Sequence, residues 1–189
     1  MNDYKTLIEN IEVDLYSFKI PEVEEKGIYI FRFMNIYGQV LKKELYLDKN
    51  TQEITLCTDE FIDTKEITFL ESLTEKDTLS LKYGSSGCFH GFESQIFITK
   101  RNNKLKFSWR STSQDLKEKF ITPKEKKYLI LFERKLRSSI RYLNQHGNCT
   151  TTESYELQLN LHKLFYVDNS CSWYGFHNMI RYILPEEML

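Results

Sequence analysis

Glycine and proline are scarce in this sequence of 189 residues, which has seven glycines and three prolines. So low a content excludes a collagen-like chain and a low-complexity tract. Apolar runs are also short. The longest uninterrupted run, residues 128–132, is far below the roughly 20 residues that a membrane-spanning helix needs. We therefore expect no transmembrane helix.

The amino-terminal segment lacks the apolar core of a secretory signal peptide, since residues 3–14 carry five charged side chains. This composition predicts a cytoplasmic location. The four cysteines are too few for a disulfide-rich scaffold, and in a reducing compartment they are expected to be free thiols. If the compartment is oxidising instead, Cys149 and Cys171 are the expected pair, because they bracket a predicted hairpin over residues 155–167.

Motifs for metal binding and for common catalytic chemistry are missing as well. The sequence has no Cys-x-x-Cys and no His-x-x-x-His, so a zinc site would have to combine ligands from distant parts of the chain. The candidate zinc ligands are Cys88, His90, Cys149, Cys171 and His177. No phosphate-binding loop or recognisable catalytic triad is present either. We expect no metal and no cofactor, and the leading hypothesis is a small intracellular protein-binding or inhibitor module without catalytic activity.

The sequence does contain enough apolar area for a core, since 41% of its residues are hydrophobic and 14% are aromatic. No repeat or linker interrupts the chain, which predicts a single domain over residues 1–189. Alternating β-branched and aromatic residues predict strands over residues 28–34, 39–47, 53–57, 66–70, 78–83, 94–100 and 104–110. Short polar turns between them, such as residues 101–103, require that consecutive strands pair antiparallel.

The clearest helix begins after Thr122. Thr122, Pro123 and Glu125 fit a capping box with proline at the first helical position. Apolar residues then recur at three- and four-residue spacing, at Leu129, Phe132, Leu136, Ile140 and Leu143. A hairpin over 155–167 and a second amphipathic helix before Pro185 follow. This order predicts an α+β fold, in which a mostly antiparallel sheet packs against one long helix, residues 122–146, and a shorter carboxy-terminal helix.

Charge is unevenly distributed along the chain. The net charge is −8 over residues 1–80, +10 over residues 81–148 and −3 over residues 149–189. Either these segments pack together and their fields partly cancel, or the middle segment presents a cationic face to an acidic protein partner. The second interpretation places the binding surface on the basic side of the 122–146 helix, at Lys127, Arg134, Arg137 and Arg141.

A glycine-rich loop interrupts the strand pattern at residues 84–91. Gly84, Gly87 and Gly91 predict positive φ angles or a close approach of the backbone to another group. Cys88 and His90 lie between them, and a thiol beside an imidazole is a candidate nucleophile for a hydrolase or transferase. In the alternative interpretation the loop is a wide hairpin connection, where Cys88 fills space and His90 lies at the surface.

Two further segments have both a binding and a packing interpretation. Basic and aromatic residues alternate over residues 104–110, which is typical of a single-stranded nucleic-acid surface. The same alternation is typical of a half-buried strand whose aromatic rings lie in the core, and this second interpretation makes nucleic-acid binding the weaker hypothesis. Residues 169–177 are rich in side chains common at binding hot spots, including Trp173 and Tyr174, but they also fit a helix start above a core.

Overall fold

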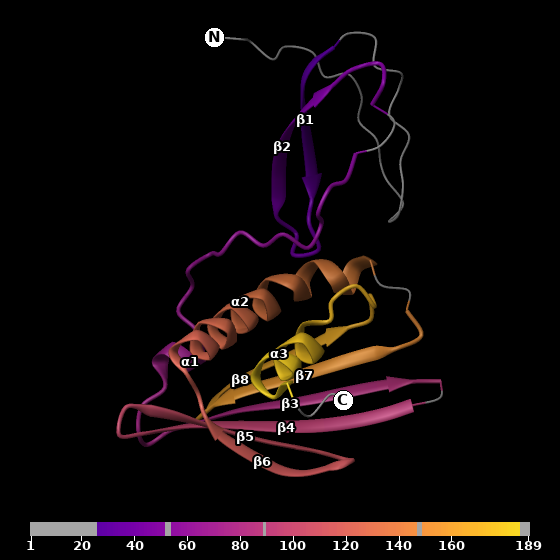
Figure 1. Ribbon diagram of the computed structural model, residues 1–189. Helices are drawn as coiled ribbons and strands as arrows, with labels where there is room; N and C mark the ends of the chain where they lie inside the picture. The colour runs from indigo at the N-terminus through magenta and orange to yellow at the C-terminus, as the bar shows by residue number, and fades with distance from the viewer. Residues whose placement is uncertain (1–25, 52–53, 89, 147–148, 186–189) are drawn as a thin grey trace. The chain divides into compact units, whose positions relative to one another are not determined.

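The computed structural model describes residues 26–51, 54–88, 90–146 and 149–185 (Figure 1). By its internal contacts the chain divides into two compact units. The smaller comprises residues 1–32 and 42–56, and the larger comprises residues 33–41 and 57–189. No helix within the described residues has the length and apolarity to cross a membrane. A single domain over the whole chain therefore stays a prediction.

Strands β1 (Gly27–Met34) and β2 (Val40–Leu47) form a two-stranded sheet. Most of this hairpin belongs to the smaller unit, while its turn and the adjoining strand ends, residues 33–41, belong to the larger unit. Both strands were expected from their alternating pattern, and both are confirmed. The predicted strand at residues 53–57 is wrong over its described part, because residues 54–57 adopt no regular structure.

The larger unit is built on a six-stranded antiparallel sheet in the order β6-β5-β4-β3-β7-β8. Its strands are β3 (Thr78–Gly87), β4 (His90–Arg101), β5 (Lys104–Ser111), β6 (Gln114–Phe120), β7 (Thr152–Leu159) and β8 (His162–Asp168). Asn102 and Asn103 both have positive φ, 50° and 58°, and form the two-residue turn between β4 and β5. Such a turn matches the twist of the strands it joins, as the sequence predicts.

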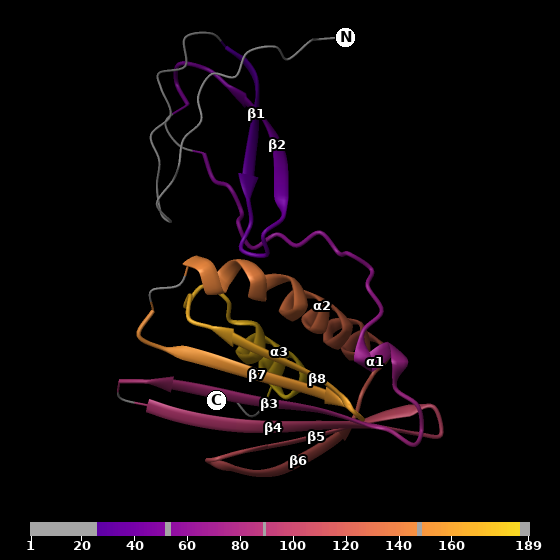
Figure 2. The ribbon, with the colours of Figure 1, turned by 180° about the vertical axis from the view of Figure 1, so that it is seen from behind.

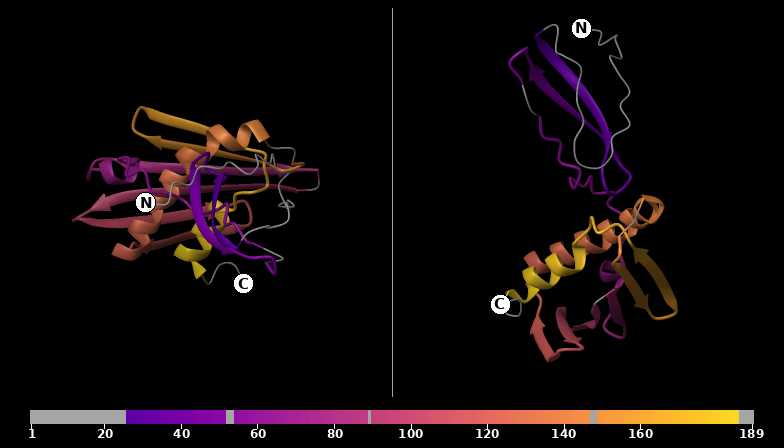
Figure 3. Two further views of the ribbon diagram at one scale, coloured as in Figure 1. Left: turned by 90° about the horizontal axis from the view of Figure 1, so that it is seen from above. Right: turned by 90° about the vertical axis from the view of Figure 1, so that its right-hand side faces the viewer.

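Two helices cover one face of this sheet (Figure 2 and Figure 3). They are α2 (Pro123–His146) and α3 (Gly175–Ile183), so the predicted α+β fold is confirmed. Residues Leu129, Phe132 and Leu136 of α2 are buried against the sheet, as predicted. The side chains of Ile140 and Leu143 lie outside the described part of the structure.

The start of α2 is capped as the sequence predicts. The Thr122 hydroxyl accepts a hydrogen bond from the Glu125 amide at 3.3 Å, and the Glu125 carboxylate accepts one from the Thr122 amide at 2.8 Å. This reciprocal pair satisfies two backbone donors that a helix terminus leaves open.

The predicted strand at residues 66–70 is wrong, because a second capping box starts a helix there. The Thr68 hydroxyl accepts from the Glu71 amide at 3.1 Å, and Glu71 accepts from the Thr68 amide at 2.9 Å. These bonds start the short helix α1 (Phe69–Ser72) in place of a strand. Strand β6 was not predicted, because its residues are mostly exposed and do not alternate in polarity.

Candidate ligand-binding pocket

Cys88 and His90 lie at the end of the β3–β4 hairpin and are both exposed. The imidazole Nε2 of His90 lies 3.3 Å from the hydroxyl of Ser85. No hydrogen bond joins Cys88 to His90 in the described residues. The catalytic role of Cys88 and His90 therefore stays an untested hypothesis.

The glycines of this hairpin do not have positive φ angles. Gly38 is the only glycine with positive φ in the described part of the chain. The alternative, a close approach, holds for two of the three. A Cβ atom at Gly84 would lie 2.8 Å from the Ser154 hydroxyl, and one at Gly87 would lie 2.6 Å from the His90 ring. Gly91 has open space around it, and nothing in the structure explains it.

A cluster of polar side chains joins β3, β7 and α3 beside the hairpin. The hydroxyls of Tyr83 and Tyr155 both donate to the Glu153 carboxylate, at 2.9 Å and 2.5 Å, and His177 Nε2 lies 3.2 Å from the Tyr83 hydroxyl. Burial, reinforced by the Glu153 charge, raises the pKa of both tyrosines far above the usual value. Both therefore remain protonated donors, and the cluster satisfies a mostly buried carboxylate rather than providing a free base.

Two of the four cations predicted to form the basic side of α2 are paired with carboxylates of the same chain. The Arg134 guanidinium binds Asp63 at 2.8–2.9 Å and Glu71 at 3.1 Å. Arg137 pairs with Glu133, one turn earlier on the helix. Lys127 is exposed, and the side chain of Arg141 lies outside the described part of the structure. Docking of an acidic partner on this face therefore stays a prediction, with two of its four cations already paired.

The aromatic residues of β5 lie in the core, as the half-buried-strand interpretation predicts. Phe107 is fully buried, and Trp109 is buried with its indole N–H donating to Ser94 Oγ at 2.6 Å. These rings are not available for stacking on bases. Among the described side chains, no group of three or more potential ligands gathers at a metal-binding distance.

Cys149 and Cys171 form a disulfide, with their Cα atoms 5.8 Å apart. The expectation of free thiols is thus wrong for these two residues, and the alternative stated for an oxidising compartment is the one the structure shows. Cys57 and Cys88 are free. Two links hold the loop that follows β8 to the segment before β7. One is the disulfide, and the other is a hydrogen bond from the Cys149 amide to the Asn169 carbonyl at 2.9 Å.

Replacing both bonded cysteines with alanine is expected to lower the free energy of unfolding by about 3 kcal/mol, since the bond closes a loop of moderate length. Chemical denaturation measures this loss. Thiol titration of denatured, unreduced protein should count two thiols in the wild type. A count of four would contradict the disulfide and restore the original expectation.

A pocket of about 170 Å³ lies within the larger unit, between α2, the start of α3 and the turn at residues 35–38. We call it the aromatic pocket. Five aromatic side chains line it, namely Tyr37, Tyr128, Phe132, Trp173 and Tyr174. Two side chains of opposite charge, Asp59 and Lys135, line it as well. Its walls come from segments far apart in the sequence.

The turn at residues 35–38 holds Tyr37 in the wall. The buried Asn35 accepts hydrogen bonds at Oδ1 from the amides of Tyr37 and Gln39, at 3.0 and 2.7 Å. Its Nδ2 donates to the Glu60 carbonyl at 2.7 Å. Gly38 has a φ of 71°, which favours glycine at this position. Asn35 thus ties the turn to the segment that carries Asp59.

The loop before α3 positions Trp173 on the opposite side. The buried Asp168 accepts from the Ser170 amide at 2.8 Å, and the disulfide fixes the same loop. The Trp173 indole then stacks on Phe132 of α2, with ring centroids 5.8 Å apart. A Cβ atom at Gly175 would lie 2.1 Å from this indole, so only glycine leaves the ring in place. The disulfide therefore supports one wall of the pocket.

Lys135 is the one cation among the described residues that line the pocket. Its Nζ lies 5.6 Å from the ring centroid of Tyr37 and 5.9 Å from that of Phe61. Within the described residues it has no hydrogen-bond or ion-pair partner. Burial lowers the pKa of Lys135, and the more distant Asp59 charge opposes this shift. Burial also raises the pKa of Tyr37 to about 12.

The chemistry of the aromatic pocket is that of binding. Among the described residues that line it there is no histidine and no cysteine. The hydroxyl of Ser172 donates to the Ser170 carbonyl at 3.2 Å and is not activated by a base. What the pocket offers is aromatic surface for a planar group and an ammonium group for an anion.

Only part of this pocket had a signal in the sequence. The hot-spot composition of residues 169–177 points to Trp173 and Tyr174. The packing interpretation is confirmed for Trp173, which is buried, whereas a binding role for the exposed Tyr174 stays a prediction. Tyr37, Asp59 and Lys135 were missed, because nothing local marks them as neighbours. No protein-family model matches the chain, and neither curated proteins nor solved structures gave a match.

Proposed function

We propose that this protein is a non-catalytic binding module that takes a planar aromatic group into the aromatic pocket. The observation that carries the proposal is a pocket of about 170 Å³ lined by five aromatic side chains. An apolar cavity of about 150 Å³ is large enough to bind benzene. Ligand sites in general are concave and combine apolar or aromatic surface with a few placed polar groups, and this pocket combines five aromatic side chains with polar ones such as Asp59 and Lys135.

The arrangement of the candidate catalytic groups supports a binding role over an enzymatic one. His90 contacts Ser85 rather than Cys88, and the carboxylate of Glu153 is held by two tyrosine hydroxyls. None of these groups lines the aromatic pocket. A thiol-dependent reaction would need a base and a cleft beside Cys88, and no observation favours that alternative.

The compartment is a separate proposal. A cytoplasmic location follows from the composition of the sequence alone, whereas the Cys149–Cys171 disulfide favours an oxidising compartment. Thiol counting on protein trapped with an alkylating agent in intact cells distinguishes the two. Two alkylated thiols per chain would contradict the cytoplasmic proposal, and four would support it.

Binding is tested by titrating the full, oxidised chain with ring-sized neutral and charged fragments. The readout is the indole N–H signal of Trp173 in a ¹H–¹⁵N spectrum. Trp109, the other tryptophan, lies buried in the sheet and serves as an internal reference. We expect saturable shifts at Trp173 and none at Trp109. If no fragment shifts Trp173 at millimolar concentration, the proposed function is wrong.

A matched pair of variants places the binding in the pocket. Asn178 is an exposed residue of α3 that lines the pocket, whereas Arg181 is exposed on the same helix and does not line it. Asn178→Phe fills the pocket and is expected to weaken fragment binding at least about tenfold. Arg181→Phe is expected to leave it unchanged. Equal effects of the two substitutions would contradict this location.

A further inference from the structure

The residues around Lys135 point to the chemical class of the ligand. The inference rests on the proposed function, because it concerns the same pocket. Lys135 projects from α2 into a site whose lining includes five aromatic side chains. Its ammonium is half-buried, and in the part of the chain that the structure describes no carboxylate lies within ion-pair distance of it.

The other buried or half-buried cations of this helix differ from Lys135 in this respect. Arg134 binds two carboxylates, and Arg137 binds Glu133. Removing a charge from water without a partner is costly, and natural proteins pair almost all such groups. Lys135 has only the faces of Tyr37 and Phe61, at 5.6 and 5.9 Å, as substitutes. This cation–π contact compensates only part of the lost hydration.

We infer that the aromatic pocket binds a planar ring that carries a carboxylate, with the ring between the aromatic walls and the carboxylate against the Lys135 ammonium. The anion supplies the partner that the ammonium lacks. An ion pair formed there is stronger than one on the open surface, because the rings around it displace water.

The negative charge of Asp59 weakens the binding of an anion in the pocket. It is exposed, so water screens its charge, but it still repels an anion that enters the pocket. The same carboxylate attracts Lys135 from beyond ion-pair distance. Removing the Asp59 charge should therefore strengthen anion binding, which is the opposite of the effect of removing the Lys135 charge.

The test compares benzoate with benzamide, which have nearly the same shape and differ in charge. Both are titrated at pH 7 into the oxidised full chain, with the Trp173 indole signal as the readout. In the wild type we expect benzoate to bind about tenfold more tightly than benzamide. Lys135→Met retains the apolar stem and removes the charge, and it should reduce this ratio to about one without changing benzamide binding.

Asp59→Asn is the second variant, and it keeps the test valid if Lys135→Met does not fold. It is expected to raise benzoate affinity about twofold and to leave benzamide affinity unchanged, as is typical of removing a screened charge. Equal binding of benzoate and benzamide by the wild type would overturn the carboxylate inference and leave the proposed function intact. A Trp173 signal that responds to neither probe nor to any other ring-sized fragment would overturn both.

Discussion

Leu136→Asp is expected to leave the protein unfolded at 25 °C. Leu136 lies at the middle of α2, its side chain is fully buried, and the core on which it packs joins both helices to the sheet. Removing a buried leucine side chain alone costs about 2–5 kcal/mol. The substitution would also bury a carboxylate without a partner. The sum matches or exceeds the 5–15 kcal/mol that typically stabilises a domain.

Far-ultraviolet circular dichroism and a thermal melt measure this outcome. Leu136→Ala is the graded variant, and it should lower the free energy of unfolding by about 2–5 kcal/mol while the protein still folds. Lys126→Asp is the control, since it places the same carboxylate on an exposed position of the same helix. A cooperative melt of Leu136→Asp at the wild-type temperature would contradict the packing of α2 on the sheet.

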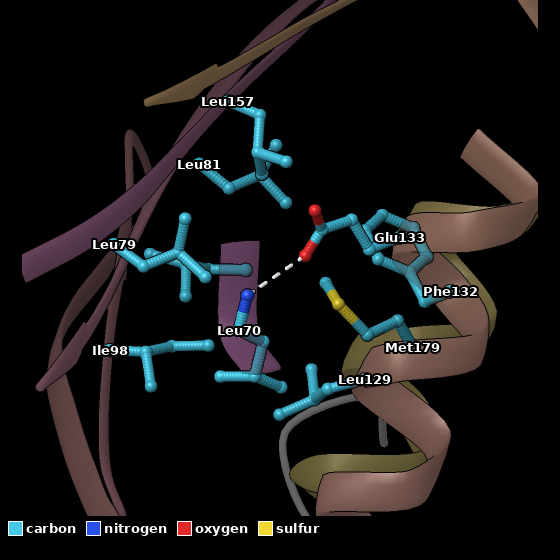
Figure 4. A pocket seen from close by; sticks show the side chains of 10 residues that line it. Leu70, Leu79, Leu81, Ile98, Leu129, Phe132, Glu133, Leu157 and Met179 are labelled. Carbon is cyan, nitrogen blue, oxygen red and sulfur yellow. Dashed lines mark hydrogen bonds between the residues drawn. The ribbon is translucent and has the colours of Figure 1, made fainter. Parts of the chain in front are cut away.

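Glu133→Ala is expected to lower the free energy of unfolding by about 3–5 kcal/mol, because it removes a buried acceptor and leaves its donors unpaired. Glu133 projects from α2 into the apolar core, where its carboxylate accepts from the amide of Leu70 at 3.2 Å (Figure 4). It also accepts from the amide of Phe69 at 2.6 Å. It also pairs with Arg137. The carboxylate borders a small cavity of about 20 Å³ that is lined mainly by leucine and isoleucine side chains, so little water can hydrate it.

The effect has a local signature as well as a global one. Without Glu133, the first two amides of α1 lose their acceptor, and their hydrogen exchange should accelerate more than that of β3. Glu133→Gln keeps one acceptor oxygen and should cost less than the alanine variant. Glu66→Ala removes an exposed carboxylate and should change stability by less than about 0.5 kcal/mol. Equal losses for Glu66→Ala and Glu133→Ala would mean that the buried carboxylate does not stabilise α1.

The elements that could be predicted from the sequence are those determined by nearby residues. The capping box at Thr122 and the periodic apolar residues after it predict α2, and all of these residues lie at the start of that helix or within it. The turn at Asn102 and Asn103 is local in the same sense. Residues 66–70 form no strand, although their short pattern of polar and apolar residues fits one. The capping box of Thr68 and Glu71 is also present in the sequence and would have predicted the helix start.

The features that could not be predicted depend on contacts across the chain. The partners of Arg134 lie 63 and 71 residues away, so its side chain looks like a solvated cation in the sequence. For the same reason, nothing near Lys135 indicates that Tyr37 and Trp173 are its neighbours in the pocket. Strand β6 was missed for a different reason. It lies at an edge of the sheet, where burial does not impose alternation.

The position of β3 determines when this sheet can be completed during synthesis. β3 pairs with β4 on one side, through a hairpin, and with β7 on the other, where Tyr83 faces Tyr155 across more than 70 residues of chain. In a nascent chain that ends after β6, the edge of β3 that pairs with β7 is still open. The apolar face of the sheet that α2 and α3 cover is exposed as well. Nascent chains of that length are therefore expected to be prone to aggregation until β7 is made.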